Sequence, residues 1–224
     1  MRFLGCIPTQ KFVSDVSLIR DMEYLLKKKK SSVLMYPEAS YSFDGTCTPL
    51  PRKMGVILKK LDVPVVMIES FGAFSRNPLY NELQVRKGVP VSAKATLLYT
   101  REEIREKSVR ELSDGLDAAF GFDHFKWQKE QGIVIDEPFR ADGLNRILYK
   151  CPHCHSEFNM EVRGGNTLHC RECGYEAKSD ELGFLHNTKG FGPEIRYVSD
   201  WSRFILDSLT EQVRNGEDVW LEDV

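Results

Sequence analysis

Hydrophobic positions recur along this chain with two different periods. A period of two residues predicts strands, and a period of about 3.6 residues predicts helices. Short apolar runs at 33–36 and 63–69, the second rich in β-branched residues, are typical of buried strands, and the alternating apolar face of 91–99 is typical of a half-buried strand. Apolar residues recur at helical spacing in five further stretches, which predict helices over 14–30, 53–61, 100–120, 123–131 and 201–213.

The order of these elements predicts the fold class. A strand, a loop, a helix and a second strand follow one another between residues 33 and 69, which is typical of an α/β layer with buried, mainly parallel strands. We therefore expect residues 1–148 to form an α/β domain with a mixed, mainly parallel sheet flanked by helices.

Composition is that of a soluble globular protein. The 224 residues include 42% hydrophobic and 29% charged residues, with a formal net charge of −2, which excludes a disordered or collagenous chain. The longest apolar run, 63–68, is far shorter than the ~20 residues of a membrane-spanning helix. No signal-peptide pattern is found at the N-terminus, so we expect a cytoplasmic protein.

Charge is distributed unevenly. Residues 1–60 carry 11 Lys and Arg against 5 Asp and Glu, and the remainder of the chain is acidic. This basic segment could face anionic lipid or phosphate. It could equally be a solvated helix face, because the lysine run 27–30 would complement the dipole at a helix C-terminus.

Cysteine spacing carries the clearest chemistry. Two Cys-x-x-Cys pairs separated by fifteen residues match a structural zinc site of four thiolates, Cys151, Cys154, Cys170 and Cys173. Such a site leaves no open position for a substrate, so the ion would be structural Zn²⁺; an iron–sulfur centre is the alternative. We expect a zinc ribbon over 149–178, followed by a helical segment over 179–224. The isolated Cys6 and Cys47 are interpreted as small packed residues.

Residues around the cysteines argue against histidine ligands and against nucleic-acid binding. Three histidines, His153, His155 and His169, lie near the cysteines and are interpreted as surface residues rather than ligands. The basic residues of the ribbon are matched one for one by acidic residues, whereas a nucleic-acid surface needs a net basic stripe. We therefore expect no nucleic-acid partner.

A polar segment after the first predicted strand is a candidate binding site. Glu38 follows the apolar run at the end of a strand, where α/β proteins place their ligands, and Lys11 could hold a phosphate as a point charge. The alternative is structural: Glu38 would cap a turn and Lys11 would lie on the surface.

Three blocks of this chain resemble motifs of the glycerophospholipid acyltransferases of the 1-acyl-sn-glycerol-3-phosphate type. They are Gly5-Cys-Ile-Pro-Thr-Gln-Lys11, Tyr36-Pro-Glu-Ala-Ser-Tyr-Ser42 and Val63-Pro64, and the resemblance covers about residues 1–130. It implies acyl transfer from acyl-CoA or acyl carrier protein to a lysophospholipid hydroxyl, with peripheral membrane contact. It also implies the substrate-binding residues Gly5, Lys11, Glu38, Ser40 and Ser42.

The chain departs from this family at the catalytic motif. In the family, a histidine followed five positions later by an aspartate supplies the general base, and no histidine of this chain is followed in that way. Tyr41 also stands where the family has arginine, and Ala39 where it has glycine. We expect either an N-terminally incomplete enzyme or an acyltransferase-like protein without catalysis. A non-catalytic zinc-ribbon binding module, taking lipid, protein or nucleic acid, is the alternative function.

Overall fold

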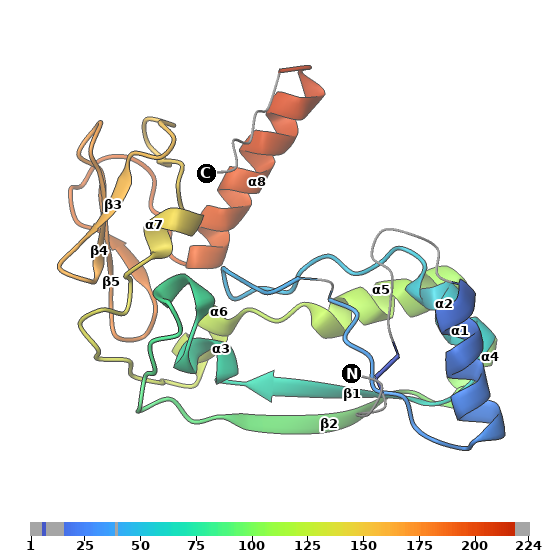
Figure 1. Ribbon diagram of the computed structural model, residues 1–224. Helices are drawn as coiled ribbons and strands as arrows, with labels where there is room; N and C mark the ends of the chain where they lie inside the picture. The colour runs from blue at the N-terminus through green and yellow to red at the C-terminus, as the bar shows by residue number, and fades with distance from the viewer. Residues whose placement is uncertain (1–5, 8–15, 39, 218–224) are drawn as a thin grey trace. The chain divides into compact units, whose positions relative to one another are not determined.

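The computed structural model describes residues 6–7, 16–38 and 40–217 (Figure 1). The chain divides into two compact units. Unit 1 comprises Met1–Tyr41, Cys47–Glu69 and Lys94–Gly121, and unit 2 comprises Ser42–Thr46, Ser70–Ala93 and Phe122–Val224. The predicted ribbon and the predicted C-terminal segment therefore belong to one unit, together with residues that precede them.

The early helices of unit 1 begin and end close to where apolar spacing predicts them. The segment expected to be one helix over 14–30 contains α1 (Val16–Glu23) and the π-helix η2 (Tyr24–Lys28), and α2 spans Met54–Leu61. Gly55 allows α2 to approach α5 (Val109–Phe120) closely, since a Cβ there would lie 2.2 Å from the carbonyl oxygen of Val109.

The helix predicted over 100–120 is divided in two. Thr100 caps α4 (Arg101–Glu106) and Ser108 caps α5 (Val109–Phe120), each through a complete capping box with a glutamate three residues later. The second capping box gives the backbone amides of Ser108 and Glu111 side-chain partners, so a new helix begins at Val109. The buried core of unit 1 lies between α2, α4, α5 and the end of β2 (Ser92–Tyr99): Met54, Leu58, Tyr99, Ile104, Leu112 and Leu116.

The strand predicted over 33–36 is not found. These residues have no regular structure, and Leu34 and Tyr36 are 66% and 81% exposed. The other two predicted strands are present as β1 (Val65–Phe71) and β2 (Ser92–Tyr99), which pair in a two-stranded sheet. The composition of β1 predicted a strand buried on both faces. Instead exposure alternates along β1, and Ile68 is 58% exposed, so one face is open.

Unit 2 contains the larger sheet, of order β3-β4-β5-β6. Its strands are Met160–Arg163, Thr167–Cys170, Glu176–Ser179 and Leu185–Asn187. In the described part of residues 1–148 the sheet has only the two strands β1 and β2, so the mainly parallel sheet that we expected there is wrong, whereas the mixed α/β class holds. All three pairings of the four-stranded sheet are antiparallel. Short turns join these strands, and a parallel pair would need a crossover of a dozen residues or more.

Helices complete unit 2. They are α3 (Ala73–Arg76), the 3-10 helix η3 (Leu79–Asn81), α6 (His124–Glu130), α7 (Leu144–Ile147) and α8 (Val198–Arg214). The first half of α8 buries Val198, Trp201 and Ile205 in the same core as Leu168 and Leu185 of the sheet. None of the helices in the described part of the chain is both long and apolar enough to cross a lipid bilayer.

Candidate metal centre

Four sulfur atoms converge in unit 2 beside the end of β4, where Cys170 is the last residue. The Sγ atoms of Cys151, Cys154, Cys170 and Cys173 all lie within 4.8 Å of one another. Two of the separations are 3.7 Å, between Cys151 and Cys173, and 3.8 Å, between Cys154 and Cys170. All four cysteines are free thiols, so the pairs are not disulfides. The four residues predicted from spacing therefore form one cluster.

Two tight turns aim the sulfurs at a common point. In the first, the amide of His155 donates to the carbonyl of Cys151 at 3.0 Å, and His155 takes a left-handed φ of 62°. In the second, the amide of Gly174 donates to the carbonyl of Cys170 at 3.0 Å, and Gly174 has a φ of 77°. Glycine adopts that conformation at little cost, so the sequence Cys-x-x-Cys-Gly favours the second turn.

One side of the cysteine cluster packs in the hydrophobic core, and the other side is open to solvent. Cys151 and Cys170 are fully buried, whereas Cys154 is exposed and Cys173 is half-buried. Tyr175 and Trp201 are fully buried and belong to the same core as the two buried cysteines. One face of the centre is thus part of the hydrophobic core, and the other faces solvent.

The thiols of the cluster differ in pKa, because their burial and their hydrogen bonds differ. Burial raises the pKa of Cys151 and of Cys173. Burial also acts to raise the pKa of Cys154, but hydrogen bonds from the side chain and backbone of Ser156, together with those from the Cys173 and Cys151 thiols, outweigh it and lower this pKa to about 7. The Ser156 hydroxyl lies 3.1 Å from the Sγ of Cys154 and 3.6 Å from that of Cys170. Spacing analysis did not identify Ser156, although its position two residues after a cysteine places it beside the site.

The donor set fits a tetrahedral metal ion. Bonds of ~2.3 Å from Zn²⁺ to four thiolates place the sulfurs about 3.8 Å apart. The two separations above, 3.7 and 3.8 Å, agree with that value. The nearby histidines do not add ligands, since none joins the group of ligand atoms found among the described residues. Nδ1 of His169 instead forms a hydrogen bond with Oε1 of Glu176, at 3.1 Å.

The predicted substrate residues are only partly described. Gly5 and Lys11 lie outside the described residues. In unit 1, Glu38 is half-buried, and its Oε1 accepts the backbone amide of Thr48 at 2.9 Å, while Ser40 is exposed. Ser42 belongs to unit 2, and its buried hydroxyl has no hydrogen-bond partner among the described residues. The substrate site as a whole therefore stays a prediction.

The two isolated cysteines differ from each other. Cys6 is exposed, so its interpretation as a packed residue is wrong. Cys47 is half-buried, and its thiol donates to the carbonyl of Thr48 at 3.0 Å. Burial raises the pKa of Cys47 to about 12, with further contributions from Glu38 and Asp117. Cys47 is therefore a protonated thiol at neutral pH and a poor nucleophile.

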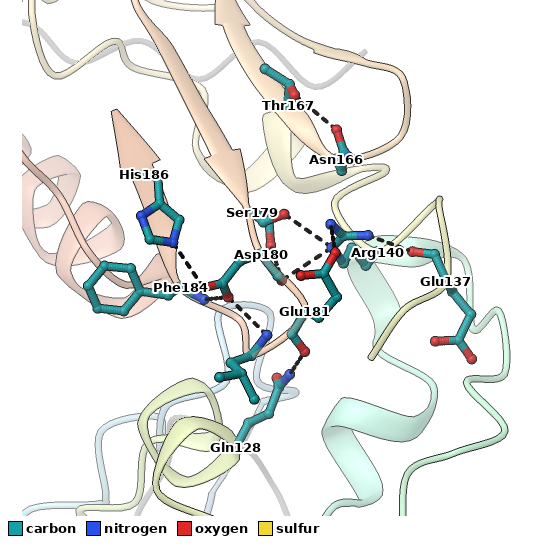
Figure 2. Close-up of polar contacts among 11 residues, drawn as sticks. Gln128, Glu137, Arg140, Asn166, Thr167, Ser179, Asp180, Glu181, Phe184 and His186 are labelled. Carbon is teal, nitrogen blue, oxygen red and sulfur yellow. Dashed lines mark hydrogen bonds and ion pairs between the residues drawn. The ribbon is translucent and has the colours of Figure 1, made fainter. Parts of the chain in front are cut away.

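A second polar cluster surrounds the turn between β5 and β6, and Figure 2 shows its contacts. Asp180 accepts the amides of Leu182 and Phe184 through Oδ1, each at 2.9 Å, and its Oδ2 lies 2.9 Å from Nε2 of His186. Arg140 reaches the same turn from another segment and donates to the carbonyls of Ser179 and Asp180. No sequence motif indicated this cluster, because Arg140 lies 40 positions before Asp180 along the chain.

Comparison with protein-family models, with curated proteins and with solved structures finds no match to this chain.

Proposed function

We propose that the four-cysteine cluster is a structural zinc site and that the chain is an acyltransferase-like protein carrying this zinc ribbon. Two sulfur separations, 3.7 and 3.8 Å, support the metal, because they agree with the ~3.8 Å spacing of thiolates around tetrahedral Zn²⁺. Four thiolates fill the coordination shell, so the ion would stabilise the ribbon rather than bind a substrate. Metal binding would then supply folding free energy to a module with short strands.

Metal analysis tests the first part of this proposal. Protein purified without chelator should contain about one equivalent of zinc, and removal of the metal should unfold the ribbon. Iron with a visible absorption band would instead identify an iron–sulfur centre or a single iron bound by four thiolates. A C151S/C154S variant without its first pair should lose the metal, while a C6S variant should retain it.

The acyl-transfer part rests on the three ordered blocks that resemble acyltransferase motifs. In this proposal the acceptor is a lysophospholipid, the donor is acyl-CoA or acyl carrier protein, and the protein works in peripheral contact with a membrane. Glu38 would accept a hydrogen bond from the acceptor's hydroxyl. The loop holds this carboxylate in place, because Oε1 accepts the backbone amide of Thr48.

Binding and turnover test separate parts of the acyl-transfer proposal. We expect E38Q to weaken binding of oleoyl lysophosphatidate about tenfold, the equivalent of one hydrogen bond to a charged group. An E106Q variant, altered at an exposed glutamate of unit 1, is the matched control. We expect no significant acyl transfer by this chain, because the histidine-aspartate motif of the family is missing. Equal binding by E38Q and E106Q would contradict the role of Glu38.

The ribbon offers less support for a nucleic-acid partner. Lys150 pairs with Glu157 at 3.0 Å, and Arg163 pairs with Glu161 at 2.7 Å. Side chains held in such pairs are not free to neutralise phosphates. We therefore propose no nucleic-acid function.

A further inference from the structure

A run of lysines ends the first helical segment of unit 1, and no acidic residue stands beside it in the sequence. Residues 24–37 contain four lysines, at 27–30, and neither aspartate nor glutamate. All four lysines are exposed. Adjacent ammonium groups repel one another, so this segment gains from an anionic partner.

The end of the helical segment uses only one lysine of the run. Lys27 Nζ pairs with Glu23 at 3.1 Å and donates to the carbonyl of Lys60, near the C-terminal end of α2, at the same distance. Contacts of this kind are the usual structural role of a lysine at a helix C-terminus. None of the other three lysines joins an ion pair in the part of the chain that the structure describes.

The same contact brings a further lysine beside the run. Lys60, whose main chain receives Lys27, is itself exposed and joins no ion pair with any described residue. The carboxylate of Asp62, two positions further on, is already held by Arg101 at 2.8 Å and by Arg105 at 2.7 Å. Together with the lysine run, Lys60 forms what we call the basic surface of unit 1.

Exposed apolar side chains adjoin the basic surface. Leu34 and Tyr36 are 66% and 81% exposed, in a segment without regular structure. An extended chain of four residues spans at most about 14 Å, so Leu34 lies within that distance of Lys30. Tyr24 is also exposed, and the Nζ of Lys29 lies 5.7 Å from the centre of its ring. Positive charge and apolar surface therefore occur together.

This combination matches the chemistry of an anionic membrane surface. Each lysine near anionic headgroups strengthens binding about fivefold. Leucine gains by entering the acyl region, and tyrosine favours the level of the headgroups. A single-stranded nucleic acid would use the lysines and the tyrosines, but only a bilayer also buries Leu34.

We propose that unit 1 docks on anionic lipid headgroups through its basic surface, with Leu34 and Tyr36 entering the interface. The inference deepens the proposed function, because it assigns the membrane contact to named residues, and it rests on that function for the presence of a membrane. None of these residues is among the predicted substrate-binding residues.

Co-sedimentation of the full, metal-loaded chain with vesicles tests the docking. Vesicles of equal parts phosphatidylglycerol and phosphatidylcholine should bind the protein, and phosphatidylcholine vesicles should bind it at least tenfold more weakly. Sodium chloride at ~0.5 M should release it from the anionic vesicles, because salt screens the lysines. Equal binding to both kinds of vesicle, or to neither, would overturn the proposal. Tighter binding to a polyuridine oligomer than to the anionic vesicles would overturn the choice of lipid.

Paired charge variants locate the contact. K28Q/K30Q should weaken binding to the anionic vesicles about 25-fold, the product of two fivefold losses. K87Q/K178Q removes two exposed lysines of unit 2 and should bind as the unaltered chain does. Equal losses in the two variants would show that net charge, and not this surface, determines binding.

The apolar contact and the acceptor site are tested separately. L34S should weaken vesicle binding about tenfold, because a leucine side chain no longer leaves water. L206S, at a leucine of α8 that is 62% exposed, should not weaken it, and equal effects would overturn the role of Leu34. The vesicles contain no lysophosphatidate, so E38Q should bind them as the unaltered chain does. A chain that binds lysophosphatidate but not these vesicles would refute the docking surface alone, and the reverse result would refute the acceptor site alone.

Discussion

The indole Nε1 of Trp201 donates a 2.8 Å hydrogen bond to the carbonyl of Lys150, the residue directly before the first metal ligand. Trp201 is fully buried and lies in the first turns of α8, fifty-one positions further along the chain. This bond fixes the main chain where it enters the first cysteine turn. The C-terminal helix is thus part of the support for the metal centre.

Replacing Trp201 should therefore destabilise the ribbon. A W201F variant keeps an aromatic ring in the core but leaves the buried carbonyl of Lys150 without its donor, at a cost of about 1–3 kcal/mol. The cavity left by the smaller ring adds to this loss. Urea unfolding of the zinc-loaded protein, followed by far-UV circular dichroism, measures the change.

The half-buried Trp127 provides the matched substitution for this test. Its indole makes ring contacts with Phe71 and Phe122. We expect W127F to cost less than W201F, because no buried carbonyl loses its partner. Equal losses in the two variants would show that ring volume alone matters at Trp201.

Ser156 should tune the affinity of the metal centre. Its hydroxyl contacts the Sγ of Cys154, and hydrogen bonds of this kind orient a metal ligand and stabilise its thiolate. We expect S156A to weaken zinc binding by about 10- to 100-fold, as measured by competition with a chromogenic chelator. S92A, at an exposed serine of β2, should bind zinc as the unaltered chain does. An unchanged affinity in S156A would mean that the hydroxyl has no role in metal binding.

The metal centre could be predicted from sequence because its information is local. Each Cys-x-x-Cys pair determines its own turn, and Gly174 supplies the left-handed conformation that the second turn needs. The starts of α4 and α6 were predictable for the same reason, since the capping residues Thr100 and Asp123 lie within a few positions of the amides they bond.

Features that depend on distant partners could not be predicted. The composition of 33–36 favours a strand, but a strand needs a neighbour, and Leu34 and Tyr36 are exposed. Sheet direction likewise depends on how strands are connected rather than on their periodicity. Arg86 and Arg140 carry no motif, because each is bound by main-chain carbonyls that any residue could provide.

Acid should destabilise unit 2 partly through Asp180. Burial acts to raise the pKa of Asp180, but hydrogen bonds with His186 and with the amides of Phe184 and Leu182 outweigh it, so the folded-state pKa lies below its usual range. The unfolded chain therefore binds the proton more readily. The stabilisation is complete above the unfolded value of about 4 and is lost as the pH falls through the folded-state pKa.

A D180N variant should lose this dependence on pH. We expect it to be less stable by about 1 kcal/mol at pH 7, and to show a shallower decline in unfolding free energy between pH 5 and pH 3 than the unaltered chain. Release of metal in acid affects both proteins equally, so the comparison isolates Asp180. D136N, at an exposed aspartate of unit 2, is the control, and its unfolding free energy should depend on pH as in the unaltered chain. The same dependence on pH in D180N would refute the role of Asp180.

Gly143 should be among the positions of unit 2 that tolerate substitution least. Its φ is +84°, and a Cβ there would lie 1.8 Å from the carbonyl oxygen of Tyr80, the residue whose hydroxyl accepts from Arg86. G143A must therefore shift the backbone of η3, and we expect a loss of about 3 kcal/mol or more in urea unfolding. Gly164 separates the cost of a positive φ from the cost of a steric clash. Its φ is +57°, but nothing lies within 4 Å of its Cβ position. G164A should cost only the ~1–2 kcal/mol of a left-handed alanine, and an equal cost at both positions would show that the close approach to Tyr80 carries no penalty.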